Sequence, residues 1–249
     1  LDFYFYIILA SNFLFLIGYN NNKEIFKNTL KYLSLRHKYL IFYFFIFLLI
    51  SLLPASDPDS LDYHLGVPIQ IIRDQIYKPD FYWIQSRVAG LGEFINLIGL
   101  SIGTKNFGSI IQFSSILVLI KIYFYLKIKL NSKFNFYLLI FSCPLIFTFL
   151  IIQKIQLLPN IGIILSILLL LENLKLDNKR LIYVSLFILF MTATFKYSFF
   201  INVFSVLFAF IILNILDKKI INYVVPTIVI FSITLFPLLL KNYFFLVIH

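Results

Sequence analysis

Charged residues are scarce in this chain. Only 13% of its 249 residues are Asp, Glu, Lys or Arg, whereas 61% are hydrophobic and the mean hydropathy is +0.95. A soluble domain carries roughly a quarter charged residues and is about half apolar. The apolar runs are also long and continuous, which is typical of helices that cross a bilayer. The composition therefore predicts an integral membrane protein built from helices.

Several chemical signatures are also missing. The single cysteine, Cys143, excludes an intrachain disulfide framework and a cysteine-ligated metal site. The chain contains no Walker-type glycine-rich loop, no HExxH, no CxxC and no GxSxG. These absences argue against nucleotide hydrolysis, redox chemistry and metal-dependent hydrolysis. No motif indicates a cofactor or a metal ligand set, although a divalent metal ion remains open. The net charge of +10 suits loops that face anionic lipid, and nothing suggests nucleic acid as a partner.

The apolar runs predict an all-α fold, a polytopic transmembrane bundle of about nine spans in one domain over residues 1–249. Because the chain begins at Leu1 and stops within an apolar segment, we expect it to be C-terminally truncated. Several expected spans are near the lower limit of about 17 residues for crossing a bilayer. The expected spans are Phe3–Tyr19, Tyr39–Pro54, Val88–Gly103, Phe107–Leu126, Phe134–Ile152, Leu157–Leu171, Leu181–Phe195, Tyr197–Leu216 and Ile220–Leu240.

The loops predict an orientation. The basic segment Asn20–Lys38 is expected to be cytoplasmic by the positive-inside rule, which places the acidic segment Ala55–Arg87 on the external side. In that loop Asp57 before Pro58 is typical of a helix N-cap, with Gly66 and Pro68 ending the first short helix. A second, amphipathic helix over "PIQIIRDQIY" is expected to lie in the headgroup layer. The localisation expected is the bacterial inner membrane, with the external loop facing the periplasm.

The stretch "DPDSLDYHLGVP" carries the first candidate site residues. If residues 58–65 are α-helical, Asp59, Asp62 and Tyr63 share one face. One carboxylate there could act as a general base toward a hydroxyl group. The alternative is that acidic residues in a first helical turn only stabilise the helix through its dipole. A lone histidine such as His64 makes no metal site.

Other polar residues interrupt the apolar runs. Glu93 opens an expected span and marks either a site or a buried pair, with Arg87 as a candidate partner. Lys154 and Lys196 could receive a phosphate or sugar, whereas Lys121 is better explained by a side chain that extends to the headgroups.

These segments resemble polytopic GT-C glycosyltransferases, the group similar to protein O-mannosyltransferases and aminoarabinose transferases. "DSLDYHLGVP" is similar to the family's "DALxYHLP", and "GLGEFINLIGLSIG", "QKIQLLPNIGIILSILLLLEN" and "LFILFMTATFKYSFF" follow in the family's order. The short motifs touch most of residues 52–245. The chain departs from the family pattern in three places. Asp62 occupies the variable position of the first motif, and Gly66 stands in place of the usual proline. The later segment has Gln153, Lys154 and Gln156 where many relatives carry an acid.

The resemblance implies inverting transfer of a sugar from a polyprenyl-phosphate donor to a lipid, glycan or protein acceptor on the external face. By that resemblance Asp59 matches the aspartate of the catalytic base, Tyr63 and His64 match the "YH" pair, Glu93 matches the span-opening glutamate, and Lys196 and Tyr197 match "KY". We assign Lys154 or Lys196 to the lipid phosphate. The sequence thus favours a membrane glycosyltransferase, and a transporter or flippase for lipid-linked sugars is the alternative.

Overall fold

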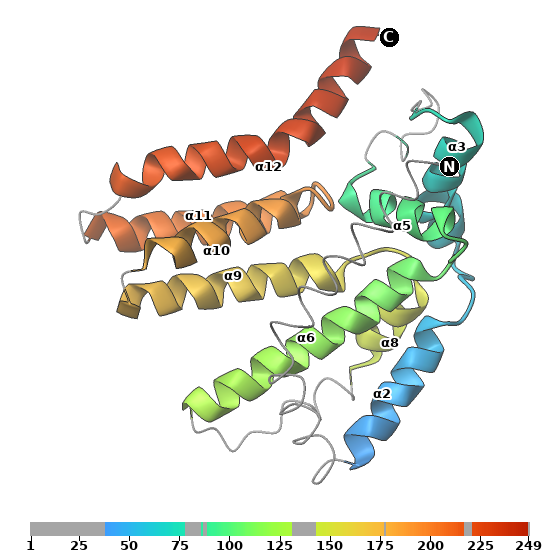
Figure 1. The fold of residues 1–249 in the computed structure, drawn as a ribbon, viewed down its shortest axis with the longest axis horizontal. Helices are drawn as coiled ribbons and strands as arrows, with labels where there is room; N and C mark the ends of the chain where they lie inside the picture. The colour runs from blue at the N-terminus through green and yellow to red at the C-terminus, as the bar shows by residue number, and fades with distance from the viewer. Residues whose placement is uncertain are drawn as a thin grey trace.

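A computed structural model describes residues 38–77, 86, 89–130, 143–176, 178–216 and 221–248. Within these residues all regular structure is helical, as expected. Figure 1 shows how the helices are arranged in space. In chain order they are α2 (Lys38–Ser51), the π-helical turn η1 (Ser60–His64), α3 (Gly66–Asp74), α5 (Leu91–Ser101), α6 (Phe107–Leu130), α8 (Pro144–Ile151), α9 (Leu157–Leu176), α10 (Lys179–Ala193), α11 (Phe199–Leu216) and α12 (Ile221–Ile248).

The expected polytopic transmembrane bundle of about nine spans is wrong for this structure. Among the helices of the described ranges, none has both the length and the apolarity needed to cross a membrane. Helices α2, α5 and α8 have 14, 11 and 8 residues, fewer than the about 17 that crossing a bilayer requires. In the expected span Phe134–Ile152, residues 134–142 lie outside the described residues, and the described part contains α8, which has 8 residues. A helix of that length extends about 12 Å, whereas a bilayer core is about 30 Å thick. The expected first span, Phe3–Tyr19, lies outside the described residues.

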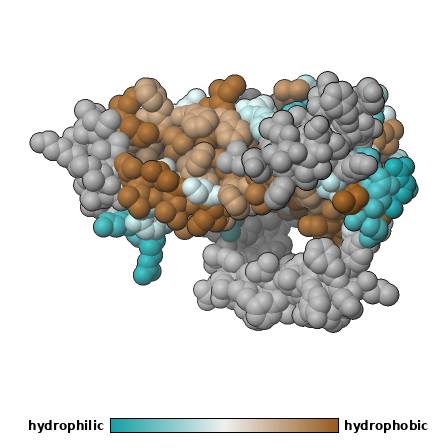
Figure 2. Space-filling view, turned by 90° about the horizontal axis from the view of Figure 1, so that it is seen from above, coloured by the Kyte–Doolittle hydropathy of each residue, from teal (hydrophilic) through white to brown (hydrophobic). Residues whose placement is uncertain are grey.

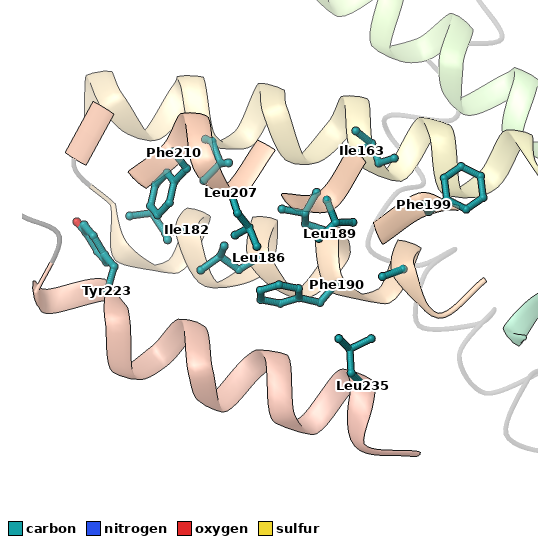
Figure 3. Close-up of a cluster of buried hydrophobic side chains, with 13 residues drawn as sticks. Ile163, Ile182, Leu186, Leu189, Phe190, Phe199, Leu207, Phe210, Tyr223 and Leu235 are labelled. Atoms are coloured by element: carbon teal, nitrogen blue, oxygen red, sulfur yellow. The ribbon is translucent and has the colours of Figure 1, made fainter. Parts of the chain in front are cut away.

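Helices α9 to α12 form the larger packed unit. Helix α10 packs along α9 and α12 and also contacts α11 (Figure 1). Figure 3 shows the cluster between them, in which Leu186, Leu189 and Phe190 of α10 lie centrally and are almost completely buried. A ring contact between Phe190 and Phe231 joins α10 to α12, with centroids 5.3 Å apart. Apolar packing therefore holds this unit together.

Helices α2, α6 and α8 form a second, smaller packed unit. Phe47 of α2, Ile116 of α6 and Leu150 of α8 are fully buried in its cluster. Phe47 also makes an edge-on ring contact with Phe147, with centroids 5.0 Å apart. Helix α6 contacts α9, so this unit and the α9–α12 unit are adjacent.

A third group of elements, η1, α3 and α5, has little apolar core. Among the described residues, its buried hydrophobic cluster contains Tyr63, Val67 and Ala89, with Ile71 and Tyr77 packed against it. Helix α5 connects the group to the rest of the structure, since it contacts η1, α3 and α6. Polar contacts described below supply the remaining connections.

The external loop folds differently from the expectation in two respects. The Asp57 carboxylate accepts a hydrogen bond from the Ser60 backbone N–H at 2.8 Å, which confirms Asp57 as a capping residue. The following turn is π-helical rather than α-helical, because the Leu65 N–H bonds to the Ser60 carbonyl at 2.9 Å. The wider turn leaves Asp59 and Asp62 exposed while Tyr63 is buried, so the three side chains do not share one face. Gly66 begins α3 instead of ending the first helix.

Apolar side chains cover much of one face of the molecule (Figure 2). Among the residues of α11 and α12, Ile201, Phe208, Val225 and Ile233 are each at least 65% exposed. The second helix expected in the loop is shorter than "PIQIIRDQIY" at its C-terminal end, because α3 ends at Asp74 and Ile76 lies beyond it. Ile69 and Ile76 are both exposed.

Candidate functional site

Three chain segments meet beside the N-terminal half of α5. They are the turn that carries Asp59 and η1, the segment between α8 and α9 that contains Lys154, and the turn before α11 that contains Lys196. Each segment carries a charged residue that the sequence singled out as a candidate site residue. The candidate site therefore consists of residues far apart in the sequence.

Asp59 and Lys154 form the exposed part of the site. The Asp59 Oδ2 atom lies 4.0 Å from the Lys154 Nζ atom. The Asp59 side chain is 78% exposed, whereas that of Lys154 is 23% exposed. The carboxylate is therefore open to an incoming molecule, and the ammonium group beside it is held close to the protein.

Lys196 is the second cation of the site. Its pKa is lowered, first because burial disfavours the charged form, and next because the Lys154 ammonium lies within hydrogen-bond reach and repels it. The carboxylates of Glu93 and Asp59 act in the opposite direction. Two lysines are thus close enough to repel each other, and Asp59 and Glu93 are the neighbouring carboxylates. Such a pair is suited to binding an anion.

Glu93 and His64 form a buried pair behind these charges. The His64 Nδ1 and Glu93 Oε1 atoms are 2.6 Å apart, and both side chains are no more than 5% exposed. The other Glu93 oxygen, Oε2, accepts a hydrogen bond from the Gly90 backbone N–H at 2.6 Å. Arg87, the candidate partner from the sequence, lies outside the described residues. Glu93 is therefore a buried, paired carboxylate, and His64 is the partner that the sequence did not indicate.

Tyrosine side chains surround the buried glutamate. Burial, and next the charge of Glu93, raises the pKa of Tyr63 far above its ordinary value. Burial, followed by the neighbouring Tyr197 and Glu93, raises the pKa of Tyr77 to about 12. The Tyr77 hydroxyl donates a hydrogen bond to the Ser86 carbonyl at 2.5 Å. These phenols remain protonated near neutral pH and can serve as hydrogen-bond donors.

Tyr197 lies at the edge of the site. Its side chain is 39% exposed and its ring is nearly parallel to that of Phe200, with an interplanar angle of 17°. Every predicted site residue thus belongs to this region: Asp59, Tyr63, His64, Glu93, Lys154, Lys196 and Tyr197. The exposed members are Asp59 and Tyr197, and the others lie deeper.

Buried amides and hydroxyls connect the segments, and most of these residues were not predicted. The Asn96 amide donates hydrogen bonds to the His64 carbonyl at 3.1 Å and to the Gln153 carbonyl at 2.9 Å. The Gln153 backbone N–H donates to the Ser60 hydroxyl at 2.7 Å, and its side chain donates to the Ser109 hydroxyl at 2.7 Å. In the sequence, these connecting residues could have been suspected because amide side chains are unusual inside apolar runs.

Gln112 of α6 fixes the segment that carries Lys154. Its amide nitrogen donates to the Lys154 carbonyl at 2.9 Å, while its carbonyl oxygen accepts from the N–H groups of Gln156 and Leu157. These N–H groups belong to the start of α9, where no intrahelical acceptor exists. Gln112 therefore caps α9 and restrains the backbone of Lys154 in one arrangement.

Two further features concern possible ligands. A cavity of about 340 Å³ lies between α5, α10 and α12, and its lining is almost entirely apolar; Gly90, Leu91, Met191, Thr194 and Ile233 are among the residues that form it. Within the described residues, no group of three or more His, Cys, Asp or Glu side chains is arranged to hold a metal ion. The local chemistry is therefore that of an exposed carboxylate, two adjacent lysines and neighbouring apolar surface.

Comparison with known proteins gives a family but no activity. No curated protein and no solved structure matches the chain. A family model, that of the DUF1420 N-terminal domain, matches residues 8–248, which include all of the segments that form the candidate site. The chain therefore belongs to the DUF1420 N-terminal domain family.

Proposed function

We propose that the chain transfers a sugar from a polyprenyl-phosphate-linked donor to the hydroxyl group of an acceptor. The observation that carries the proposal is the arrangement of Asp59, Lys154 and Lys196, an exposed carboxylate beside two adjacent cations. A sugar transferase without a bound metal needs a base for the acceptor and positive charge for the leaving phosphate. The resemblance of the surrounding segments to GT-C glycosyltransferases supports the same assignment.

Asp59 is the proposed general base. In the reaction the acceptor oxygen attacks the anomeric carbon of the sugar, and its proton passes to the Asp59 carboxylate. The bond between the anomeric carbon and the phosphate oxygen breaks, the electron pair remains on the phosphate, and the configuration at the anomeric carbon inverts. The high exposure of Asp59 supports this role, because a base must be within hydrogen-bond reach of the proton that it accepts.

Lys154 and Lys196 are the proposed phosphate ligands. Negative charge on the phosphate increases as the sugar leaves, so positive charge that is already in position stabilises the transition state more than the ground state. The lowered pKa of Lys196 supports this role, since a bound anion would relieve the repulsion between the two ammonium groups. Binding should therefore become weaker as the pH rises and Lys196 loses its proton.

The apolar surroundings support a lipid donor. The cavity bounded by Gly90, Thr194 and Ile233 offers an apolar surface for part of an isoprenoid chain, and Thr194 is two residues from Lys196. The exposed apolar side chains of α11 and α12 are compatible with contact to lipid. Because the donor is itself a membrane lipid, the proposal locates the protein at the bacterial inner membrane, with the site on the external face and a lipid, glycan or protein as acceptor.

The test is transfer of a radiolabelled sugar by the full chain from a panel of polyprenyl-phosphate sugars in phospholipid vesicles. Removal of a general base lowers turnover by about 10²- to 10⁴-fold, and we expect a loss of that size for Asp59→Asn. Asp62→Asn is the matched control, because Asp62 is an exposed carboxylate of the same turn without a described contact to Lys154. Lys154→Gln should also lower turnover, whereas Lys121→Gln, at an exposed site on α6, should not.

Two results would overturn the proposal. The first is equal turnover of the Asp59→Asn and Asp62→Asn variants. The second is movement of the labelled lipid from one leaflet of the vesicle to the other without any transfer of the sugar, which would favour the transporter alternative.

A further inference from the structure

We propose that Asn96, together with Glu93, is a positioning residue that sets the distance between the Asp59 carboxylate and the lysine pair. Both residues lie in the first two turns of α5, and each is bonded to chain segments that carry charged groups of the site. The effect of Asn96 and Glu93 on catalysis rests on the proposed function. Their effect on the positions of the charged groups can be tested without any sugar transfer.

Asn96 connects the Asp59 segment to the Lys154 segment. Its amide nitrogen donates to the His64 carbonyl, which ends the π-helical turn that begins beside Asp59, and to the Gln153 carbonyl, which immediately precedes Lys154. Both partners are carbonyl oxygens, so the NH₂ group must face them and the orientation of the amide is fixed. One side chain that is 1% exposed thus joins two segments through a single nitrogen atom.

A second contact closes this connection into a ring. The Gln153 backbone N–H donates to the hydroxyl of Ser60, the residue next to Asp59. The two segments therefore touch directly at Ser60 and Gln153, and Asn96 joins them again from α5. A ring of three hydrogen bonds fixes the relative position of the segments in more than one direction, which a single bond could not do.

Glu93 fixes the start of α5, which contacts the third segment. Its carboxylate binds His64 through Oε1 and the Gly90 N–H through Oε2. The next N–H, that of Leu91, donates to the Thr194 carbonyl at 2.9 Å, two residues before Lys196. The same turn of α5 therefore determines where the Asp59, Lys154 and Lys196 segments stand relative to one another.

The Asn96 side chain is not arranged for maximum stability. Its Oδ1 atom is buried and has no hydrogen-bond partner among the described residues. A buried polar atom without a partner costs about 1–3 kcal/mol. The Asn96 Oδ1 atom also packs closely against Gly108, because a Cβ atom at position 108 would lie only 2.5 Å from it. An apolar residue would remove this unpaired oxygen but would also leave the His64 and Gln153 carbonyls without the Asn96 donor, so the paired nitrogen is the part of the side chain that joins the segments.

The test compares Asn96→Leu, which is neutral and similar in size, with Ser185→Ala. Ser185 is also fully buried and joins two helices by one hydrogen bond, from its hydroxyl to the Ser166 carbonyl. The first readout is NMR titration of ¹³C-methylated lysines in the full chain, with Lys154 and Lys196 assigned from arginine variants. We expect the pKa of Lys196 to move back toward its ordinary value in Asn96→Leu, because Lys154 is no longer held beside it. Ser185→Ala should leave the titration unchanged.

The second readout is the kinetics of sugar transfer. A misplacement of about 1 Å lowers turnover by about 10²-fold, so kcat should fall in Asn96→Leu by up to that factor while KM for the donor changes much less. If the wild-type chain transfers no sugar, the proposed function fails, but the lysine titration still decides the positioning role. An unchanged titration of Lys196 in Asn96→Leu would overturn the inference. Should that variant not fold, Ser60→Ala opens the same ring at its bond with the Gln153 backbone N–H, and an unchanged titration there would equally overturn the inference.

Discussion

The two ends of the molecule are held together by different forces. In the α9–α12 unit, thirteen buried hydrophobic residues form one cluster between four helices. Around η1, α3 and α5 the comparable cluster contains, among the residues that the structure describes, Tyr63, Val67 and Ala89. This end has hydrogen bonds that join Asn96 to His64 and Gln153, and Glu93 to His64, all about 30 or more positions apart. The Gly90 N–H also donates a short hydrogen bond to the Glu93 carboxylate.

This difference has a consequence for function. Apolar contacts depend little on direction, so a packed cluster can adjust to small shifts of its helices. Hydrogen bonds between buried groups depend on distance and angle, and they specify one arrangement of the segments. The candidate site lies at the end that is held by directional bonds. We therefore expect substitutions in the apolar unit to change mainly stability and substitutions at the polar end to change mainly the site.

The largest expected effect on stability is that of Phe190→Ala in the apolar unit. Phe190 is 1% exposed and contacts Phe231 across the α10–α12 interface. Replacement of a buried phenylalanine by alanine leaves a cavity and costs about 3–5 kcal/mol. Denaturant unfolding followed by circular dichroism should report a loss of this size. Below the unfolding transition, the titration of Lys196 should be the same as in the wild type.

A changed titration of Lys196 in folded Phe190→Ala would contradict the comparison between the two ends. It would mean that the packing of α10 and α12 also sets the distance between the lysines. The matched apolar variant Phe47→Ala, in the α2–α6–α8 cluster, would then show whether any core defect has this effect.

The next effect in size comes from a pair of glycines at the polar end. A Cβ atom at Gly90 would lie 2.4 Å from the Phe195 carbonyl oxygen and 2.7 Å from that of Thr194, both of which are backbone atoms. Gly90→Ala should therefore separate α5 from the Lys196 segment and cost about 1–3 kcal/mol. At Gly92 the nearest atom would be 3.7 Å away, so Gly92→Ala should be neutral or stabilise α5 by about 0.5–1 kcal/mol.

Thermal unfolding and sugar transfer of both variants check this prediction. Gly90→Ala should lose transfer as well as stability, because Thr194 and Lys196 move together. Equal behaviour of Gly90→Ala and Gly92→Ala would show that the close approach of the two backbones is not needed for the site.

The sequence indicated candidate residues that the structure places close together, whereas the expected transmembrane bundle was wrong. Asp59, Glu93, Lys154 and Lys196 were recognisable because charged residues are rare in apolar runs. Their mutual placement was not, because it depends on hydrogen bonds between residues such as Asn96 and Gln153, which are 57 positions apart. The expected spans were wrong because apolar composition does not fix the length of each helix, as the 11 residues of α5 and the 8 residues of α8 show.

The π-helical turn is a second case in which local pattern was insufficient. A spacing of three and four residues predicts a shared face only if the turn is α-helical. Here one additional residue enters the turn between Ser60 and Leu65, which changes the direction of Tyr63 relative to Asp59. The local sequence is compatible with both an α-helical and a π-helical turn. The contacts of His64 with Glu93 and Asn96, which are distant in the sequence, favour the π-helical one.

The smallest expected effect is a change of stability with pH at the polar end, tested with Tyr77→Phe. Burial and the neighbouring charges raise the pKa of Tyr77 to about 12 in the folded chain, whereas an unfolded tyrosine has a pKa near 10. Above pH 10 the unfolded state therefore releases a proton that the folded state retains, and the stabilisation that Tyr77 contributes decreases as the pH rises toward 12. At pH 8 the variant should be less stable than the wild type because the hydrogen bond to the Ser86 carbonyl is absent. Denaturant unfolding at pH 8, 10 and 11 should show this difference becoming smaller; a difference that stays constant would mean that the folded environment does not disfavour the Tyr77 phenolate.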